Sequence, residues 1–310
     1  METGNMTAEQ LKAFEKAEKQ KNKIPNLFQM IWREIYRDKF AFISLLIMIS
    51  IFLIVLIGGF VIDGMPTEQT TRARLGFNNF SPAQYGPLGT DSAGRPIITM
   101  LILGARNSLV IAFAVTFGTL FIGYLIGLIA GFYGGFTDLV IMRFIDMLVM
   151  IPFLMLFIVV RQVAPGSGIS QFIYLMILFG WFGTARTFRA KVLQEAAKDY
   201  VHASKTLGTP NWKIMTRKVL PNVTSFMMVG LILGLAGNIG LETGLTVLGF
   251  GLPFGTPSIG AMIASALDPT VLQSRPWQWL PAAILIFAMT FSIYGVGSAI
   301  SRAVNPKQRR

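Results

Sequence analysis

Long apolar runs without charge, rather than alternating apolar and polar positions, dominate the sequence. The first run extends from Phe40 to Ile62 and holds 23 residues without a charged side chain. A bilayer core about 30 Å thick needs roughly 20 helical residues to cross it. The pattern predicts an all-α integral membrane protein with six transmembrane helices. The five later runs, of decreasing clarity, are Leu109–Ala130, Leu139–Val160, Ile169–Ala185, Val223–Leu241 and Pro281–Ile300.

The segment before the first run has a different pattern. Thr7 and Gln10 have the spacing of a capping box at the start of a charged, solvated helix. From Asn26 onward apolar residues recur every three or four positions, which predicts an interfacial helix leading into the first span. A charged segment of this length also argues against a cleavable signal peptide. We therefore predict a cytoplasmic segment at 1–39 and a transmembrane domain at 40–310, with outer loops at 63–108 and 242–280 and an inner loop at 186–222.

Charge placement sets the orientation of the spans. With the N-terminus inside, 21 of the 27 Lys and Arg residues fall in inner segments, so both termini are predicted to be cytoplasmic. The net charge of +12 needs no nucleic acid partner, because no aromatic-rich basic module accompanies it. A content of 53% hydrophobic and 14% charged residues excludes an ordinary soluble enzyme. The sequence has no Cys, so disulfides and Cys-based metal sites are excluded.

The inner loop contains the start and stop signals of two consecutive helices. An amphipathic pattern over Lys191–Leu207 predicts the first helix, and Gly208 supplies the left-handed residue that ends it. Thr209 is expected to cap the second helix, with Pro210 in its first turn. The second helix is expected to stop at Leu220–Pro221, before the fifth span begins. The loop is therefore predicted to form a helix-turn-helix elbow.

This elbow resembles the cytoplasmic coupling loop of ABC importer permeases. That loop reads Glu-Ala-Ala, three residues, Gly, nine residues, Ile, one residue and Leu-Pro, and Gly208 with Leu220–Pro221 fits its spacing. The triplet then falls on 202–204 and the Ile on Lys218, whereas the literal Glu-Ala-Ala at 195–197 lies too far from Gly208. The resemblance implies that six residues couple the chain to an ATPase: His202, Ala203, Ser204, Gly208, Leu220 and Pro221.

Two outer blocks resemble the C-type permeases of dipeptide, oligopeptide and nickel importers, and most closely Gram-positive oligopeptide permeases. The first joins residues 88–95 to 104–109, although Pro96 replaces the usual Asp, and the second lies after the fifth span at 241–260. With the elbow, the resemblance extends from about Phe28 to Pro306. It implies an outer-loop motif made by Gly89, Thr90, Asp91, Gly94 and Arg95.

The resemblance also implies the type I ABC importer permease fold and a set of partners. These are a second homologous permease, two ATP-binding subunits and an external peptide-binding lipoprotein, assembled in a bacterial cell membrane. The chain would form an alternating-access pathway for oligopeptides, or alternatively for dipeptides or nickel chelates. No phosphate-binding Gly-Lys motif occurs, so ATP hydrolysis is expected in the partner subunits, and no enzyme activity or cofactor is expected in this chain.

Several residues carry competing interpretations. Glu242, at the outer end of the fifth span, could bind a substrate amine or brace the outer loop, and bracing is favoured. Arg143 and Asp146 lie three residues apart in the third span, where they can pair with each other or snorkel. The small-xxx-small glycine pairs favour close helix packing. A rival of a different class, a self-contained secondary transporter, would need acidic residues at mid-membrane, and the span centres have none.

Overall fold

The computed structural model describes residues 27–65, 74, 76–163, 168–253 and 255–304. These residues form helices joined by turns, and they contain no β-strand beyond one isolated bridge between Thr90 and Pro96. The predicted capping box at Thr7 and Gln10 lies outside them. In chain order the helices are α2 (Leu27–Arg37), α3 (Lys39–Asp63), α5 (Ile97–Tyr133), α6 (Gly135–Val149), α7 (Phe153–Val163), α8 (Ile169–Ala196), α9 (Asp199–Thr206), α10 (Asn211–Ile214), α11 (Leu220–Val247), α12 (Ile259–Ala264), α13 (Pro269–Ser274) and α14 (Leu280–Val304).

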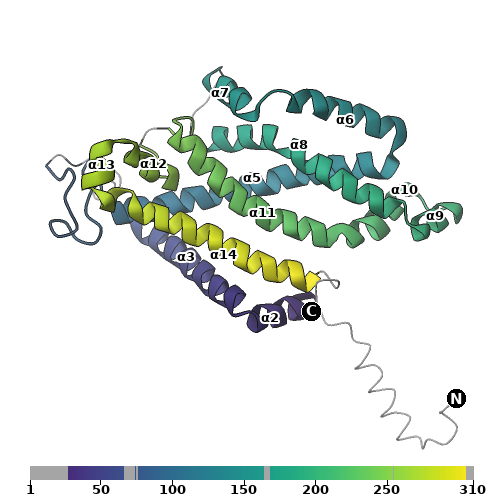
Figure 1. Cartoon of the computed structure of the whole chain (residues 1–310), viewed down its shortest axis with the longest axis horizontal. Coiled ribbons are helices and arrows are strands. Elements are labelled where there is room, and N and C mark those ends of the chain that lie inside the picture. Colours follow the sequence, from purple (N-terminus) through teal and green to yellow (C-terminus); the bar gives the residue numbers. More distant parts are fainter. Residues whose placement is uncertain (1–26, 66–73, 75, 164–167, 254, 305–310) are drawn as a thin grey trace, which may run out of the picture.

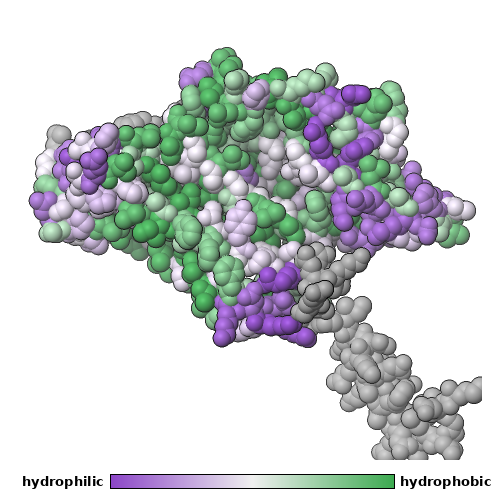
Figure 2. Space-filling view, in the orientation of Figure 1, coloured by the Kyte–Doolittle hydropathy of each residue, from purple (hydrophilic) through white to green (hydrophobic). Residues whose placement is uncertain are grey.

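The long helices run side by side between two polar ends. Short helices α12 and α13 and the outer loop lie at one end, and α9 and α10 lie at the other (Figure 1). Figure 2 shows apolar side chains over the middle of the molecule and hydrophilic residues gathered towards its ends. This distribution matches a protein whose central belt faces lipid and whose ends face water.

Four of the described helices are long and apolar enough to cross a membrane: Lys39–Asp63, Ile97–Tyr133, Asn211–Val247 and Leu280–Ala303. They contain the predicted first, second, fifth and sixth spans. The second is longer than predicted, because α5 begins at Ile97 inside the predicted outer loop. At 37 residues it measures about 55 Å, well beyond the apolar core of a bilayer.

The predicted third span is not one continuous helix. It is divided into α6 and α7, which are bent by 77° at a break that contains Pro152. Proline has no backbone N–H and its ring clashes with the preceding turn, which accounts for a break at this position. The predicted fourth span lies in α8, where Arg186, Arg189 and Lys191 follow a short uncharged part. This charged end explains why α8 is less apolar than the four helices named above.

Close packing of α5 against α8 forms the centre of the fold. A Cβ added to Gly123 would lie 2.7 Å from Thr184, and one added to Gly127 would lie 2.6 Å from the Ala185 carbonyl oxygen. Gly230 and Gly234 of α11 pack in the same way against α5. The predicted role of these glycine pairs is confirmed. Among the described residues, however, nothing lies within 4 Å of a Cβ added at Gly240 or Gly244.

Candidate functional site

The inner loop forms an elbow whose helices differ from the predicted ones at three points. First, α8 ends at Ala196 and α9 begins at Asp199, so the predicted single helix over Lys191–Leu207 is wrong. The extended backbone of Lys198 interrupts it, and Asp199 stabilises the new N-terminus through the helix dipole. Second, Pro210 and not Thr209 precedes α10, and no side chain caps that helix.

The third difference lies at Pro221, where the predicted helix stop is wrong. A π-helical turn at Met215–Val219 joins α10 to α11, so the helix continues through Leu220 and Pro221. The wider turn accommodates a residue that has no N–H to give to a regular α-helical ladder. By contrast Gly208, with φ +73°, is the left-handed residue between α9 and α10, as predicted.

The residues aligned with the coupling triplet divide between the surface and the interior. His202 and Ala203 are exposed, whereas Ser204 is only 2% exposed. Its hydroxyl donates to the Tyr200 carbonyl oxygen and accepts a hydrogen bond from Lys218 Nζ, each at 2.6 Å. Ser204 is therefore part of the elbow's own structure and is not available to a partner in this conformation.

Two apolar side chains stand exposed beside Ala203 at the tip of the elbow. Leu207 is 83% exposed and Trp212 is 54% exposed. Leu207 is the last residue of the predicted amphipathic helix. In the structure α9 ends at Thr206, so Leu207 lies just beyond the helix, directly before Gly208. We call the exposed surface made by His202, Ala203, Leu207 and Trp212 the elbow tip. Exposed apolar side chains grouped in this way are typical of a protein contact surface.

A hydrogen-bond network beneath the elbow tip joins three helices. Tyr200 OH donates to Glu195 Oε1 at 2.8 Å, and Asn222 Nδ2 donates to Tyr200 OH at 3.0 Å. Burial opposes ionisation of Glu195, but hydrogen bonds from Lys198 and Tyr200 outweigh it and lower the pKa of its carboxyl below the ordinary value. The carboxylate therefore stabilises the elbow at neutral pH, and this contribution is lost as the pH falls through the lowered pKa.

The apolar side of the elbow packs on the main bundle. Val201, Ile214 and Val219 are fully buried in a cluster with α5, α8 and α11. In addition, Lys205 Nζ lies 5.0 Å from the centre of the Phe132 ring at the end of α5. These contacts attach the elbow to three long helices at once. The other buried members of this cluster are Leu120, Tyr124, Leu128, Phe132, Phe188, Val192 and Val223.

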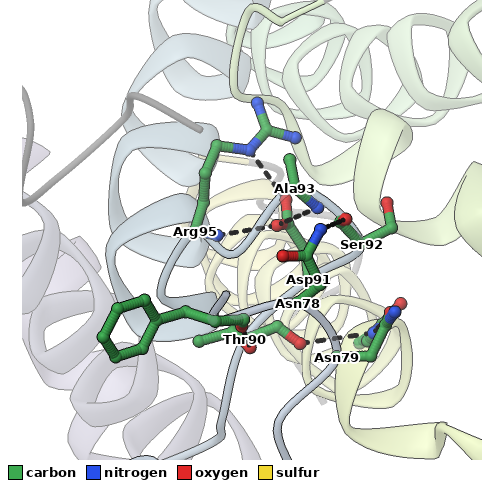
Figure 3. Close-up of polar contacts among 9 residues, drawn as sticks. Asn78, Asn79, Thr90, Asp91, Ser92, Ala93 and Arg95 are labelled. Carbon is green, nitrogen blue, oxygen red and sulfur yellow. Dashed lines mark hydrogen bonds and ion pairs between the residues drawn. The ribbon is translucent and has the colours of Figure 1, made fainter. Parts of the chain in front are cut away.

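At the opposite end, the outer-loop motif folds around Asp91 (Figure 3). Asp91 Oδ1 accepts hydrogen bonds from the backbone N–H groups of Ala93 and Arg95, and Oδ2 lies 2.7 Å from Arg95 Nε. These contacts satisfy the carboxylate within the loop. Asp91 and Arg95 are thus placed to hold the loop's shape.

The remaining motif residues fix this loop to its surroundings. Thr90 is buried, and its carbonyl oxygen accepts from Gln278 Nε2, which also donates to Asn79 Oδ1. A Cβ added to Gly89 or Gly94 would lie 2.3 Å from a backbone carbonyl oxygen, so only glycine fits at either position. Sequence reasoning missed Gln278, which sits far along the chain.

Glu242 is fully buried between α11 and α5. Ser108 Oγ donates to its Oε2 at 2.9 Å, and Thr246 Oγ1 donates to its Oε1 at 3.1 Å. Its nearest described polar partners are hydroxyl groups, and no Lys or Arg in the described residues pairs with it. In this structure both carboxylate oxygens are therefore engaged by groups of the chain itself.

A groove of about 580 Å³ opens between α5, α8 and α11. Its lining, as far as the structure describes the chain, contains no charged residue. The Asn238 amide donates to Thr116 Oγ1 behind the groove, and Tyr124 OH donates to the Met227 carbonyl oxygen. Sequence reasoning named Glu242 as a possible pathway or gate residue but none of these positions, because they converge only through helix packing. The polar lining residues are Thr119, Tyr124, Thr184, Thr187 and Asn238.

Known sequences are similar to almost the whole chain. Residues 26–82 match the N-terminal transmembrane domain of oligopeptide transport permease C. The oligopeptide transport system permease protein OppC of Lactococcus lactis subsp. lactis is 41% identical over 94% of this chain and 98% of its own length. The OppC of Bacillus subtilis is 32% identical, covering 95% and 94%, and the dipeptide transport system permease DppC of that species is 31% identical, covering 91% and 86%.

A solved structure shares the fold. The inward-facing MetNI methionine ABC transporter contains a chain that superposes with a TM-score of 0.57 at 18% identity, over 68% of this chain and 98% of that one. Residues 123–310, more than half of the sequence, match a family of permeases described as the inner membrane component of binding-protein-dependent transport systems. The chain belongs to this family of ABC importer permeases.

Proposed function

We propose that the chain is the permease subunit of an ATP-driven importer of oligopeptides in a bacterial cell membrane. The observation that carries this proposal is the 41% identity to a protein named as an oligopeptide permease, over nearly the full length of both chains. With a second, homologous permease it would form the pathway, and two ATP-binding subunits and an external peptide-binding lipoprotein would complete the complex. Peptide would be the substrate of transport, and ATP hydrolysis would take place in the partner subunits.

The proposed mechanism is alternating access driven from the elbow tip. Closure of the ATP-binding subunits would push on Ala203 and Leu207, and the buried contacts of α9 would carry the displacement into α5, α8 and α11. The groove between these helices would supply one side of the pathway. Its hydroxyl and amide groups can bind a peptide backbone, and the absence of fixed charge among its described lining suits varied side chains. Glu242 would brace the outer end, close to the loops that face the external protein.

The proposed topology has six spans with both termini in the cytosol. The bent pair α6–α7 would act as one span and α8 as another, in addition to the four helices above. The native chain has no Cys, so single cysteines report their side without background. We expect Gln84→Cys to react with an impermeant maleimide from outside and Gln194→Cys to react only after the cells are opened. Labelling of Gln194→Cys in intact cells would contradict the topology.

Purification and reconstitution test the function itself. The tagged chain, expressed with its neighbouring subunits, should carry the ATP-binding subunits and a second permease through purification. Vesicles containing this complex and the external binding protein should accumulate labelled peptide only when ATP is present on the side of the elbow. Uptake without ATP, driven by a proton or sodium gradient, would instead establish a secondary transporter.

Dipeptide or nickel-chelate import is the second candidate, and the identity to a dipeptide permease favours its dipeptide form. Competition in the same vesicles separates these substrates. Unlabelled peptides of four to six residues should compete with the labelled oligopeptide, whereas dipeptides and nickel chelates should not.

A further inference from the structure

The third predicted span contains an arginine that the fold leaves uncompensated. Asp146 pairs with Arg186 of α8 at 2.5 Å, and Asp138 pairs with Arg189, so of the two alternatives for Arg143 and Asp146 the structure does not show the mutual pair. The carboxylates of α6 are taken up by α8, which holds the two helices together. Within the part of the chain that the structure describes, Arg143 is exposed and has no ion-pair or hydrogen-bond partner. A cation on an apolar membrane helix must either meet a counter-charge or reach the polar interface.

Helix geometry places Arg143 away from α8. At 100° per residue, Asp138 and the fully buried Ile145 point towards α8, and Arg143 shares the opposite face with Phe136 and Met147. Phe136 is 81% exposed and Met147 is 60% exposed. The guanidinium is therefore surrounded by large apolar side chains that no other part of the described chain covers.

Residue size on this face indicates lipid rather than a neighbouring helix. Helices that pack closely in a membrane present small residues, as α5 does to α8 with Gly123 and Gly127. The exposed side of α6 has no Gly, Ala or Ser between Phe136 and Met150, and Thr137 is the one small residue there. Its bulky, flexible side chains are suited to contact with acyl chains.

The depth of Arg143 matches the phosphate layer of the inner leaflet. This step rests on the topology proposed above, in which the α5–α6 turn faces the cytosol. Arg143 lies about 12 Å along α6 from Gly135, and helical side chains lean towards the helix N-terminus, so its guanidinium reaches back towards that turn. The exposed Tyr133 and Phe136 flank the turn as interfacial aromatic residues do.

We propose that Arg143 binds the phosphate of an anionic phospholipid in the inner leaflet, with the acyl chains lying along Phe144 and Met147. The planar guanidinium can donate two parallel hydrogen bonds to phosphate oxygens, which supplies the missing counter-charge. The bound lipid fills the outer side of α6, and the two ion pairs to α8 hold its inner side. The α6–α7 segment is thereby seated between protein and bilayer.

Native mass spectrometry of the complete complex tests this site. The complex would be purified from nanodiscs containing equal parts of phosphatidylglycerol and phosphatidylcholine, without ATP or peptide. Wild type should retain phosphatidylglycerol in preference to phosphatidylcholine. Arg143→Gln should reduce the fraction of complexes that retain it by roughly tenfold, as expected for loss of a charge-assisted hydrogen bond. Arg143→Lys should keep part of the retention, because it keeps the charge and loses the paired donors.

The control removes an equal charge elsewhere. Arg217→Gln on the exposed side of the elbow should leave lipid retention unchanged. Unchanged phosphatidylglycerol retention in Arg143→Gln would overturn the proposal. Loss of the second permease from that variant would also overturn it, because the counter-charge of Arg143 would then be a carboxylate of the partner. A wild-type complex that retains lipid but imports no peptide would contradict only the proposed function.

Discussion

Replacing Ala203 with Asp should abolish ATP-driven peptide uptake while the chain remains in the membrane at its normal level. Ala203 is exposed at the elbow tip, so the substitution creates no clash within the chain. In the assembled importer the new carboxylate would be buried against the ATP-binding subunit, and an unpaired buried charge costs on the order of several kcal/mol. The hydrogen bonds of Ser204 with Tyr200 and Lys218 do not involve the Ala203 side chain, so they are expected to stay intact.

The measurement compares membrane level, co-purification of the ATP-binding subunits and uptake in reconstituted vesicles. Gln194→Asp is the matched control, because it adds the same charge to an exposed position of the same loop, away from the elbow tip. The control should import peptide normally. If Ala203→Asp imports peptide with the ATP-binding subunits attached, the elbow tip is not the coupling surface, whereas a variant missing from the membrane would reveal a folding defect.

Replacing Gly127 with Leu should destabilise the whole transmembrane domain. Its Cβ would lie 2.6 Å from the Ala185 carbonyl oxygen and 3.0 Å from the Arg189 backbone nitrogen, and backbone atoms cannot move aside as a side-chain end can. Overpacking typically destabilises a protein by about 1–3 kcal/mol. Because the contacts here are to backbone atoms, we expect forcing α5 and α8 apart to cost about 3 kcal/mol. The variant should unfold at a lower temperature in detergent and accumulate poorly in the membrane.

Gly183→Leu provides the control for this substitution. Gly183 lies on the exposed side of α8, and no atom of the described residues would lie within 4 Å of a Cβ added there. The control adds the same side chain to the neighbouring helix of the same pair. Both variants would be followed by the temperature at which the purified chain loses its monodisperse chromatographic peak. Equal midpoints for the two would show that the glycine contacts of α5 do not determine stability.

The positions of the four continuous spans were accessible from sequence because apolar length alone defines them. Phe40–Ile62 corresponds to α3 within one residue at each end. The interpretation of Pro221 as a helix stop was wrong. Pro152 does break its helix, but Pro221 does not, because the π-helical turn just before it absorbs the defect. Ile214, just before that turn, and Val219, at its end, are buried against the bundle, a tertiary contact that no local pattern reports.

The candidate site was partly accessible for a similar reason. Gly208 was identified because a left-handed residue leaves a local signature. Leu207 ends the amphipathic pattern of the predicted first helix, yet the fold exposes it, and Ser204, which the resemblance assigns to ATPase coupling, is buried. The groove residues Thr119 and Asn238 come from helices far apart in the chain, so only the packed bundle brings them together.

The continuous helix from Asn211 to Val247 has a thermodynamic consequence for the proposed importer. One end of this rod, about 55 Å long, carries the elbow, and Glu242 near the other end is locked to Ser108 of α5. A movement that displaces the elbow end of this helix must strain or break the hydrogen bond between Glu242 and Ser108 at its outer end. Coupling between the two ends is reciprocal. An interaction from outside that stabilises the broken Glu242–Ser108 contact must therefore stabilise the displaced elbow by the same free energy. Arrival of a loaded binding protein should therefore tighten ATP binding on the opposite side of the membrane.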